Sequence, residues 1–554
     1  MKKICALLLV LCLLPCVASA TEVEAYNERL AAFEQRFRDA VAGTENETWS
    51  AAYEEPVTIT TASSYGATMD VAVSKWGELY GETWNDNRFT KIYKDVFNID
   101  LQYNWWASDS DYEQKLRLEM ASNNLPDLTL VTNQSDLAQL AESGMILDLT
   151  DMIDEYASTW DKETWQTDGG ILMGMATYDD AVYGLPIVQA STDEFSYLWL
   201  RKDWMDALGL ANPTTFDDLV TIMDAFMAAD FDGNGVDDTI GIGIDKDLWY
   251  STRGLFSAFQ AYPQYWIEKD GALEWGGISE ENKAALQFLA DLYAKGYIDP
   301  EFVTEDNTTM LESVISGNCG VVYGGHWLGH TFGDCKELDE NADWTCVKLP
   351  SVNGEDVYSP VKSYYRGWVV ISSKCEHPEA VFKILGITTY AQQCDPDCQW
   401  LCSEENISYW YSPCKTNLSA TFNADAYEKL LYAFETGDTS NFDGIAQTYW
   451  DQLHGEYPYE WDLMFGPEED AAMQLLKESI ENDRIFFDAF TGAQSDYMLE
   501  RWETILSEEL IAYTKIIIGE TTVEEGFADW VNTFNSLGGD RITQEVNEWY
   551  AEQQ

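Results

Sequence analysis

Residues 229 to 242, ADFDGNGVDDTIGI, gather four aspartates, one asparagine and three glycines. Counted from Asp230 as position one, oxygen-bearing side chains fall at positions three, five and nine, and Gly235 falls at position six. Ca²⁺ binds roughly six to eight oxygen ligands, and a loop of the EF-hand type supplies them at this spacing around a sharp glycine turn. The spacing predicts a Ca²⁺ site whose ligands are Asp230, Asp232, Asn234, Asp238 and the carbonyl of Val236.

The loop departs from the EF-hand pattern at position twelve, where Gly241 stands in place of a bidentate glutamate. Asp237 and Thr239 are the nearest alternatives for completing the coordination. An acidic Asn-Gly turn can also close a helix without any metal, so a metal-free turn is the competing interpretation. Because no second, paired loop is present, the pattern favours a structural ion over a calcium sensor.

Catalytic signatures are weak in this chain. There is no serine or cysteine nucleophile elbow, and His326 and His330, four residues apart in HWLGH, lack the glutamate of a zinc protease motif. A glycosidase needs only two well-placed carboxylates, and 97 acidic residues supply such pairs without specificity. A secreted glycosidase therefore stays open as the alternative function. An adhesin or scaffold would require repeats or an anchoring motif, and the sequence shows neither.

The N-terminus indicates export. Residues 1–20 combine two lysines, an apolar run and the small residues Ala18-Ser19-Ala20, as in a secretory signal peptide. Cleavage after Ala20 is favoured over lipid attachment at Cys16, because Pro15 rather than a small residue precedes that cysteine. The following segment, 24–42, is predicted to form an amphipathic helix rather than a flexible tether.

Composition narrows the range of partners. The chain has 554 residues, enough for roughly two to four domains, and a formal net charge of −65. So much negative charge repels nucleic acids and anionic membranes, and polyanionic ligands would need a local basic pocket. Eight cysteines lie between Cys319 and Cys414, and their even number in an exported protein suggests disulfides or buried thiols rather than a metal cluster.

The order of elements predicts an α/β fold. Strands are expected at 54–64, 97–105 and about 127–132, and helices at 111–122 and 135–143. This strand–helix alternation implies a parallel sheet with crossover helices. The later chain is expected to form extended segments at 181–191, 195–204 and 239–244, helices at 214–230 and 281–298, short strands between 319 and 368, and three C-terminal helices.

Four pieces of the chain, in order, carry a family resemblance. EQKLRLEMASNNLPDLTLV (113–131), YGLPI (183–187), LRKDWMDALGLANPTTFDDL (200–219) with the aspartate loop, and the C-terminal segment 513–550 resemble family 1 extracellular solute-binding proteins of ABC importers. The resemblance implies a structural calcium in that loop. It also implies an oligosaccharide-class ligand, delivery to ABC permease subunits, a monomer and no enzymatic activity.

The resemblance further implies two lobes, each with a mostly parallel sheet flanked by helices, which close on a ligand in the cleft between them. The expected division is an N-terminal helical extension at 21–55, a first lobe at 56–185 with part of 310–370, a second lobe at 186–310 with much of 371–505, and C-terminal helices at 506–554. Sugars offer an apolar face for aromatic stacking and hydroxyls for polar contacts, although most aromatic residues simply fill cores. The expected ligand-binding residues are Tyr65, Gln189, Trp199, Trp249, Trp327, Tyr365, Arg366 and Trp368.

Overall fold

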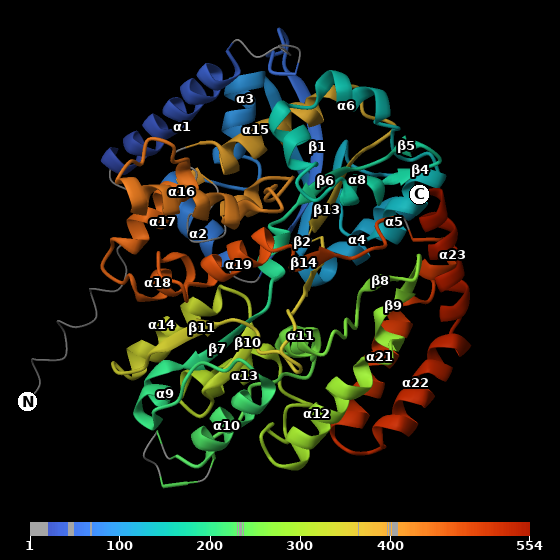
Figure 1. Cartoon of the computed structure of the whole chain (residues 1–554). Helices are drawn as coiled ribbons and strands as arrows, with labels where there is room; N and C mark the ends of the chain where they lie inside the picture. The colour runs from blue at the N-terminus through green and yellow to red at the C-terminus, as the bar shows by residue number, and fades with distance from the viewer. Residues whose placement is uncertain are drawn as a thin grey trace, which may run out of the picture. The chain divides into compact units, whose positions relative to one another are not determined.

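The structure is a computed structural model that describes residues 20–42, 49–66, 69–229, 231, 235–236, 238–363, 365–395, 397, 400–401, 408–492 and 494–553. The chain forms two compact units (Figure 1). Unit 1 comprises residues 1–189, 365–418 and 443–445, and unit 2 comprises residues 190–364, 419–442 and 446–554. The expected signal peptide at 1–20, except Ala20, and most of the aspartate loop lie outside the described residues.

Unit 1 is built on a five-stranded sheet in the order β2-β1-β3-β13-β6. Strands β1, β2 and β3 are mutually parallel, as the strand–helix alternation predicted, whereas β13 runs antiparallel to both β3 and β6. β3, which lies between β1 and β13, and the edge strand β6 are buried along their whole length. The strands are β1 (Val57–Tyr65), β2 (Ile99–Ser108), β3 (Leu128–Val131), β4 (Thr177–Tyr178), β5 (Ala181–Val182), β6 (Leu185–Val188) and β13 (Tyr365–Ile371).

The helices of unit 1 include the N-terminal helix that the sequence predicted. Phe33 and Phe37 of this helix, α1, are buried, and Figure 1 shows α1 lying along α3 and α15. Phe37 packs on Phe97 of α3 and on Tyr390 of α15, so α1 is part of the core of unit 1. The helices are α1 (Ala20–Val41), α2 (Met69–Tyr80), α3 (Arg88–Phe97), α4 (Asp109–Ala121), α5 (Gln134–Glu142), α6 (Thr150–Tyr156), α7 (Thr159–Thr164), α8 (Ile171–Gly174), α15 (Glu379–Gln393) and the 3₁₀ helix η5 (Ser408–Tyr411).

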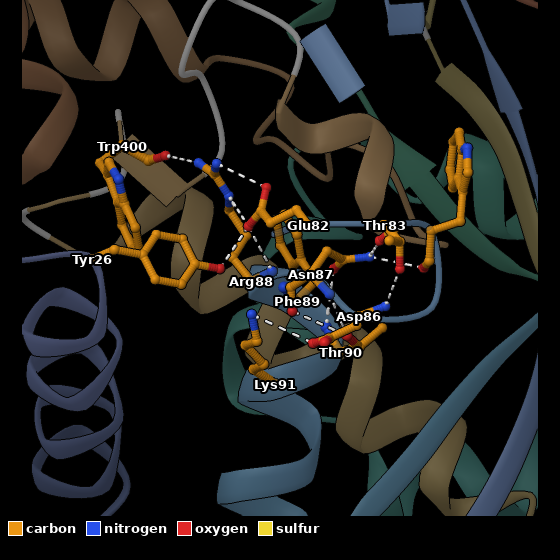
Figure 2. A network of polar contacts seen from close by, with 11 residues as sticks. Tyr26, Glu82, Thr83, Asp86, Asn87, Arg88, Phe89, Thr90, Lys91 and Trp400 are labelled. Atoms are coloured by element: carbon orange, nitrogen blue, oxygen red, sulfur yellow. Dashed lines mark hydrogen bonds and ion pairs between the residues drawn. The ribbon is translucent and has the colours of Figure 1, made fainter. Parts of the chain in front are cut away.

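A buried ion pair fastens α1 to the rest of unit 1. Arg88 and Glu82 are paired with both side chains fully buried, and the Arg88 Nη1 donates to the carbonyl of Trp400 at 2.8 Å. The hydroxyl of Tyr26, from α1, donates to the same Glu82 carboxylate at 2.6 Å (Figure 2). The guanidinium also lies 4.9 Å from the ring of Trp76. In this cluster, which we call the Arg88 cluster, the two buried charges pair with each other and form further hydrogen bonds with the Tyr26 hydroxyl and the Trp400 carbonyl.

Unit 2 contains the antiparallel sheet β10-β7-β11 with a hydrophobic core on each face, which corrects the expectation of a mostly parallel sheet in each lobe. Side chains of β7 alternate between the two cores, with Leu198 and Leu200 on one face and Tyr197 and Trp199 on the other. The strands of unit 2 are β7 (Tyr197–Arg201), β8 (Trp266–Lys269), β9 (Ala272–Trp275), β10 (Val321–Gly324), β11 (Trp344–Val347), β12 (Ser359–Val361) and β14 (Ile485–Phe487).

Helices surround this sheet, and the last three of them pack side by side (Figure 1). Trp530 and Tyr513 both donate to the carbonyl of Gly277, at 2.8 and 2.9 Å, which ties the C-terminal helices to the middle of the unit. The helices are α9 (Lys202–Leu208), α10 (Phe216–Met227), α11 (Trp249–Ala258), α12 (Asn282–Ala294), α13 (Asn307–Ile315), α14 (Leu328–Leu338), α16 (Phe422–Thr436), α17 (Gly444–Leu453), α18 (Tyr459–Phe465), α19 (Ala472–Glu481), α20 (Asp496–Leu499), α21 (Trp502–Ile517), α22 (Val523–Ser536) and α23 (Gly539–Glu552), with 3₁₀ helices η1 (Ser191–Glu194) and η2 (Gly276–Ile278).

The structure makes two expectations more definite and corrects a third. Residues 310–364 belong to unit 2 and residues 371–418 to unit 1, because β10 and β11 pair with β7 and α15 packs on unit 1. The expected division gave part of 310–370 to the first lobe and much of 371–505 to the second, and these stretches now have their bounds. The segment 239–244 forms only isolated bridges at Ile240 and Gly243. Of the two alternatives for the cysteines, disulfides or buried thiols, the structure shows free thiols at five of the described positions, Cys319, Cys335, Cys346, Cys375 and Cys414. None of the described helices combines the length and apolar composition needed to cross a membrane.

Candidate ligand-binding site

One edge of the unit 1 sheet collects several of the residues that the sequence singled out. The pairing register places Tyr65 opposite Ser108, and Tyr365 opposite Val188. Because β1, β2, β3 and β6 all end at this edge and β13 begins there, Tyr65, Tyr365 and Arg366 share it. The carboxyl ends of parallel strands are where open α/β sheets bind ligands, so this edge is the candidate face of unit 1.

Two cationic side chains support this edge. Lys415 is 2% exposed, and its ammonium donates to the carbonyl of Ser64 at 2.6 Å and to the hydroxyl of Ser63. Burial lowers the pKa of Lys415 to about 7. The half-buried guanidinium of Arg366 lies 6.0 Å from the ring of Tyr409, and its buried Nε has no hydrogen-bond partner in the described part of the chain. Lys415 is thus engaged by the backbone, whereas Arg366 keeps an open donor.

The structure adds an aromatic residue that sequence reasoning missed. Trp106 of β2 is 41% exposed, and its ring stacks on that of Trp84 at 5.4 Å. Trp84 in turn lies 6.0 Å from Tyr65. The alternation in LQYNWWAS would have placed Trp106 and Trp105 on opposite faces of the strand, with one of them away from the core. A large exposed tryptophan beside the ligand edge offers a stacking platform.

Unit 2 presents a second aromatic face. Trp327, half-buried, follows β10 and stacks on Tyr250 of α11 at 5.4 Å with an interplanar angle of 22°. The Tyr250 hydroxyl accepts a hydrogen bond from the backbone N–H of Gly325 at 2.9 Å, which fixes the pair of rings against the end of the strand. Trp327, which the sequence predicted to bind ligand, thus lies just after the end of β10.

A small pocket of about 60 Å³ adjoins α11. Trp249, Arg253, Tyr262, Tyr265 and Lys362 are among its lining residues, and we call it the Lys362 pocket. The Arg253 Nη1 donates to the carboxylate of Glu194 at 2.9 Å, whereas the Lys362 ammonium has no hydrogen-bond or ion-pair partner among the described residues and lies 5.1 Å from the ring of Tyr265. Because its polar groups are only partly paired, this pocket can accept a polar ligand.

The electrostatics of the Lys362 pocket follow from burial. Burial lowers the pKa of Lys362 and raises the pKa of Asp488 to about 6. Burial also raises the pKa of Glu509 to about 8, although Trp275 donates to this carboxylate at 2.8 Å. Glu509 is therefore mainly protonated at neutral pH, and the charge of the pocket is set chiefly by Arg253, Lys362, Glu194 and Asp488.

Three of the expected ligand residues turn out to be structural. Trp199 and Trp368 are 0% exposed; Trp199 packs on Phe332 at 5.0 Å, and Trp368 donates to the carbonyl of Leu172 at 2.9 Å. The Gln189 amide donates to the carbonyl of Thr416 at 2.6 Å and accepts from the Thr416 hydroxyl. The expectation that these side chains face a ligand is corrected by their burial, since each is at most 4% exposed, although the Nε1 of Trp199 has no hydrogen-bond partner among the described residues.

Trp368 is held in the core by its glycine neighbour. Gly367 has φ +131°, and a Cβ there would collide with the carbonyl of Val131 on the adjacent strand β3. The glycine in RGW therefore reflects close strand packing rather than an open loop. Tyr365 and Arg366, before this glycine, stay half-buried at the sheet edge.

Only part of the predicted calcium loop is described. Asp230, Asp232 and Asn234 lie outside the described residues, whereas Val236 is 59% exposed and Asp238 is exposed. Gly235 has φ +77°, the left-handed conformation that suits the sharp turn of an EF-hand-type loop. No group of three or more His, Cys, Asp or Glu side chains suited to a metal ion lies among the described residues, which do not include Asp230 and Asp232.

The chain belongs to the bacterial extracellular solute-binding protein family, whose model matches residues 78–405, more than half of the chain. This family comprises binding proteins rather than enzymes. Lipoprotein LipO of Bacillus subtilis is 25% identical over 463 residues, which cover 80% of this chain and 85% of LipO. The fructooligosaccharide ABC transporter substrate-binding protein FusA of Streptococcus pneumoniae is 28% identical over 219 residues, 37% of this chain and 40% of FusA.

Solved structures show the same two-lobed fold. Alginate-binding protein AlgQ2, in a structure without calcium ion, has a TM-score of 0.59 at 14% identity and covers 92% of this chain and all of AlgQ2. An EF-hand mutant of FusA in complex with fructo-nystose has a TM-score of 0.59 at 15% identity, covering 90% of this chain and 99% of FusA. At these identities the likeness establishes the fold alone.

Proposed function

We propose that this chain captures an oligosaccharide outside the cell and delivers it to the permease of an ABC importer. Membership of the solute-binding family supports capture and transport, and FusA, a relative that binds fructooligosaccharides, supports the sugar class. The observation that carries the proposal is the Trp327–Tyr250 pair, two stacked rings at a strand end. The guanidinium of Arg253, which lines the Lys362 pocket, lies 5.7 Å from the ring of Tyr250. Aromatic faces receive the apolar face of a sugar ring, and adjacent polar groups receive its hydroxyls.

Each unit contributes its own recognition surface in this proposal. In unit 1 it consists of Tyr65, Trp106, Tyr365 and Arg366 at the sheet edge. In unit 2 it consists of Trp327 and Tyr250, with Trp249 and Lys362 from the Lys362 pocket. Both surfaces combine aromatic rings with at least one cationic group, which suits a ligand with many hydroxyl oxygens.

Replacing Trp327 tests the proposal directly. Isothermal titration of the full chain with kestose, fructo-nystose, oligogalacturonides and alginate oligosaccharides should identify a ligand that binds one-to-one. Trp327→Ala should then weaken that ligand by about 1 to 3 kcal/mol, the size of a lost aromatic contact. Leu338→Ala is the matched control, because Leu338 is an apolar residue, 70% exposed, at the other end of α14.

Two results would contradict this function. Unchanged affinity in Trp327→Ala, together with a lower melting temperature, would make Trp327 a core residue. Shortened sugars in the mass spectrum after prolonged incubation with purified protein would instead support the glycosidase alternative. Intact sugar at every time point is the expected outcome.

We also propose a structural Ca²⁺ ion in the aspartate loop, held by Asp230, Asp232, Asn234, Asp238 and the carbonyl of Val236. The donor set is one of hard oxygens, and the left-handed Gly235 suits the turn between them. The ion would neutralise the carboxylates of a loop that follows α10. Because it binds only the folded state, chelation or Asp232→Ala should lower the melting temperature while leaving ligand stoichiometry intact at low temperature. Loss of ligand binding with the fold undisturbed would place the ion in the ligand site instead.

For the N-terminus we propose cleavage after Ala20, with lipidation at Cys16 as the alternative. In support, the helix α1, which begins at Ala20, is packed into unit 1 rather than forming a free tether. Intact-mass measurement of the exported protein distinguishes the two, since a lipidated N-terminus at Cys16 is heavier by the acyl chains and residues 16–20.

A further inference from the structure

The Lys362 pocket differs in charge from the rest of this acidic chain. Of the described residues that line it, two are cationic, Arg253 and Lys362, and none is acidic. The chain as a whole has 97 acidic against 32 basic residues. A chain with so much negative charge attracts an anionic group only where cations gather locally. The lining of the Lys362 pocket meets that requirement.

The acidic groups near Lys362 do not pair with it directly. Glu194 accepts a hydrogen bond from the Arg253 Nη1 at 2.9 Å, and Asp488 accepts from two backbone N–H groups at 3.3 and 3.1 Å. Burial raises the pKa of Glu509 to about 8, so this carboxyl is mainly protonated at neutral pH. These four residues are the charged or titratable groups that act on Lys362, whose pKa is lowered by burial. The Lys362 ammonium therefore lacks a counter-ion at ion-pair distance among the described residues.

The volume of the Lys362 pocket limits what enters it. It is about 60 Å³, roughly four to six times the 10–15 Å³ that one water requires and well below the roughly 300 Å³ at which pockets for whole small molecules begin. A sugar ring is too large for this space, whereas a substituent such as a carboxylate fits. Charge-assisted hydrogen bonds are about twice as strong as neutral ones, so an ammonium without a partner favours a carboxylate over a hydroxyl.

Helix α11 connects the Lys362 pocket with the Trp327–Tyr250 pair. Trp249 lines the pocket, and the next residue, Tyr250, stacks on Trp327. Arg253, which also lines the pocket, follows Tyr250 by three residues and therefore lies on the same side of the helix. The stacked rings and the pocket are thus neighbours along one helix, which allows one ligand to use both.

We propose that the Lys362 pocket receives the carboxylate of a uronate unit, so that the ligand of this chain is an acidic oligosaccharide. Lys362 is then the residue that determines specificity, because its ammonium distinguishes an ionised carboxylate from a neutral hydroxymethyl group on the same ring. Arg253 keeps its pairing with Glu194 and borders the carboxylate with a second positive charge. This inference rests on the proposed sugar-binding function and names the substrate class of that same site.

The test compares each acidic oligosaccharide with its own methyl ester, which keeps the rings and linkages and removes the charge. Titration calorimetry of the full chain uses oligogalacturonates, oligomannuronates and glucuronoxylo-oligosaccharides, with kestose and fructo-nystose as neutral sugars. At least one acid should bind, and it should bind roughly tenfold to a hundredfold more tightly than its ester, because only the acid forms a charge-assisted hydrogen bond. This comparison uses the wild-type protein and so does not depend on how a substitution affects folding.

Variants then assign the preference to Lys362. Lys362→Met should reduce the ratio of acid to ester affinity to about one, because the charge-assisted contact is lost. Lys362→Arg should retain most of the ratio, since a guanidinium also pairs with a carboxylate. Trp327→Ala should weaken acid and ester alike and leave the ratio unchanged. The exposed control Lys202→Met, on α9, should change neither affinity.

The outcomes separate this inference from the proposed function. If only neutral sugars bind, or if acid and ester bind the wild type equally, the Lys362 pocket is not a carboxylate site and the proposed function stands without it. A wild-type ratio in Lys362→Met, with an unchanged melting temperature, would likewise overturn the role of Lys362. If no acidic or neutral sugar binds, the proposed function fails and the inference fails with it.

Discussion

The Arg88 cluster of unit 1 and the Lys362 pocket of unit 2 both place cations among aromatic rings. Around Arg88 the guanidinium meets the Glu82 carboxylate, a backbone carbonyl and the ring of Trp76, and its side chain is fully buried. Around Lys362 the ammonium has an aromatic neighbour, Tyr265, but no hydrogen-bond partner among the described residues, and the side chain borders a pocket. Both regions combine a cation with aromatic rings, but only the cation of the Arg88 cluster has hydrogen-bond partners among the described residues.

This difference separates a structural role from a binding role. A buried charged group whose hydrogen bonds and ion pairs are all made within the chain stabilises the fold and has no unpaired donor or acceptor left for a ligand. A charged group that borders a pocket and lacks a partner can instead form a new hydrogen bond or ion pair when a ligand binds. Burial alone therefore does not identify a site, since both cations are removed from bulk water to a large extent.

Breaking the Arg88 cluster should give the largest effect on stability. Arg88→Met leaves the Glu82 carboxylate buried without its counter-ion, which should lower the free energy of unfolding by about 3 to 5 kcal/mol. Denaturant titration followed by tryptophan fluorescence measures the loss. Lys91→Met is the matched control, because its ion pair with Asp86, 3.4 Å long, is partly exposed and should contribute less than about 1 kcal/mol.

The double variant Glu82→Leu with Arg88→Met sharpens this prediction. Because it removes both charges, it should recover a large part of the lost stability. If the single variant is as stable as the wild type, the cluster is not a structural anchor and the contrast with the Lys362 pocket fails.

Glu509, which lies near Lys362 and Tyr513, should give the next largest effect, and that effect depends on pH. Its folded-state pKa is raised to about 8, well above the ordinary value of about 4.3 for glutamate. Between these values the folded state holds a proton that the unfolded state has lost, so stability should fall as pH rises, by up to about 1.4 kcal/mol per pH unit. Glu509→Gln keeps the acceptor for Trp275 and should flatten the thermal-stability profile across this window; an unaltered profile would mean that Glu509 is ionised in the folded state.

The fold was largely predictable from local patterns, and the site was not. The alternation in VTITTASS and the punctuation by Pro126 predicted β1 and β3, because these signals are carried by neighbouring residues. The bounds of the two units within 310–418 could not be derived locally, because strand pairing across more than a hundred residues decides them. The exposure of Trp106 and the burial of Trp199 depend on what packs above each ring, which no local spacing records.

Trp106→Ala tests the recognition surface of unit 1 and should have a moderate effect. Its ring is 41% exposed and stacks only partly on Trp84, so stability should change by less than about 1 kcal/mol. Oligosaccharide affinity should fall by about 1 kcal/mol if the ring stacks on the ligand. Trp106→Phe should restore part of that affinity, and equal affinities in all three proteins would remove Trp106 from the surface.

Lys362→Met should give the smallest change in stability. It tests directly whether Lys362, unlike Arg88, has no structural role. Its pKa is lowered by burial, which means that the folded state disfavours the charged ammonium. An apolar side chain of similar length removes that cost, so stability at neutral pH should stay within about 0.5 kcal/mol of the wild type or rise. The unfolded state holds the lysine proton to higher pH than the folded state does, so the advantage of the variant should shrink as pH rises toward the ordinary lysine pKa. Oligosaccharide affinity should fall at the same time, because the open donor is lost, while the exposed control Lys202→Met changes neither property. A loss of stability as large as that of Arg88→Met would show that Lys362, like Arg88, is a structural cation.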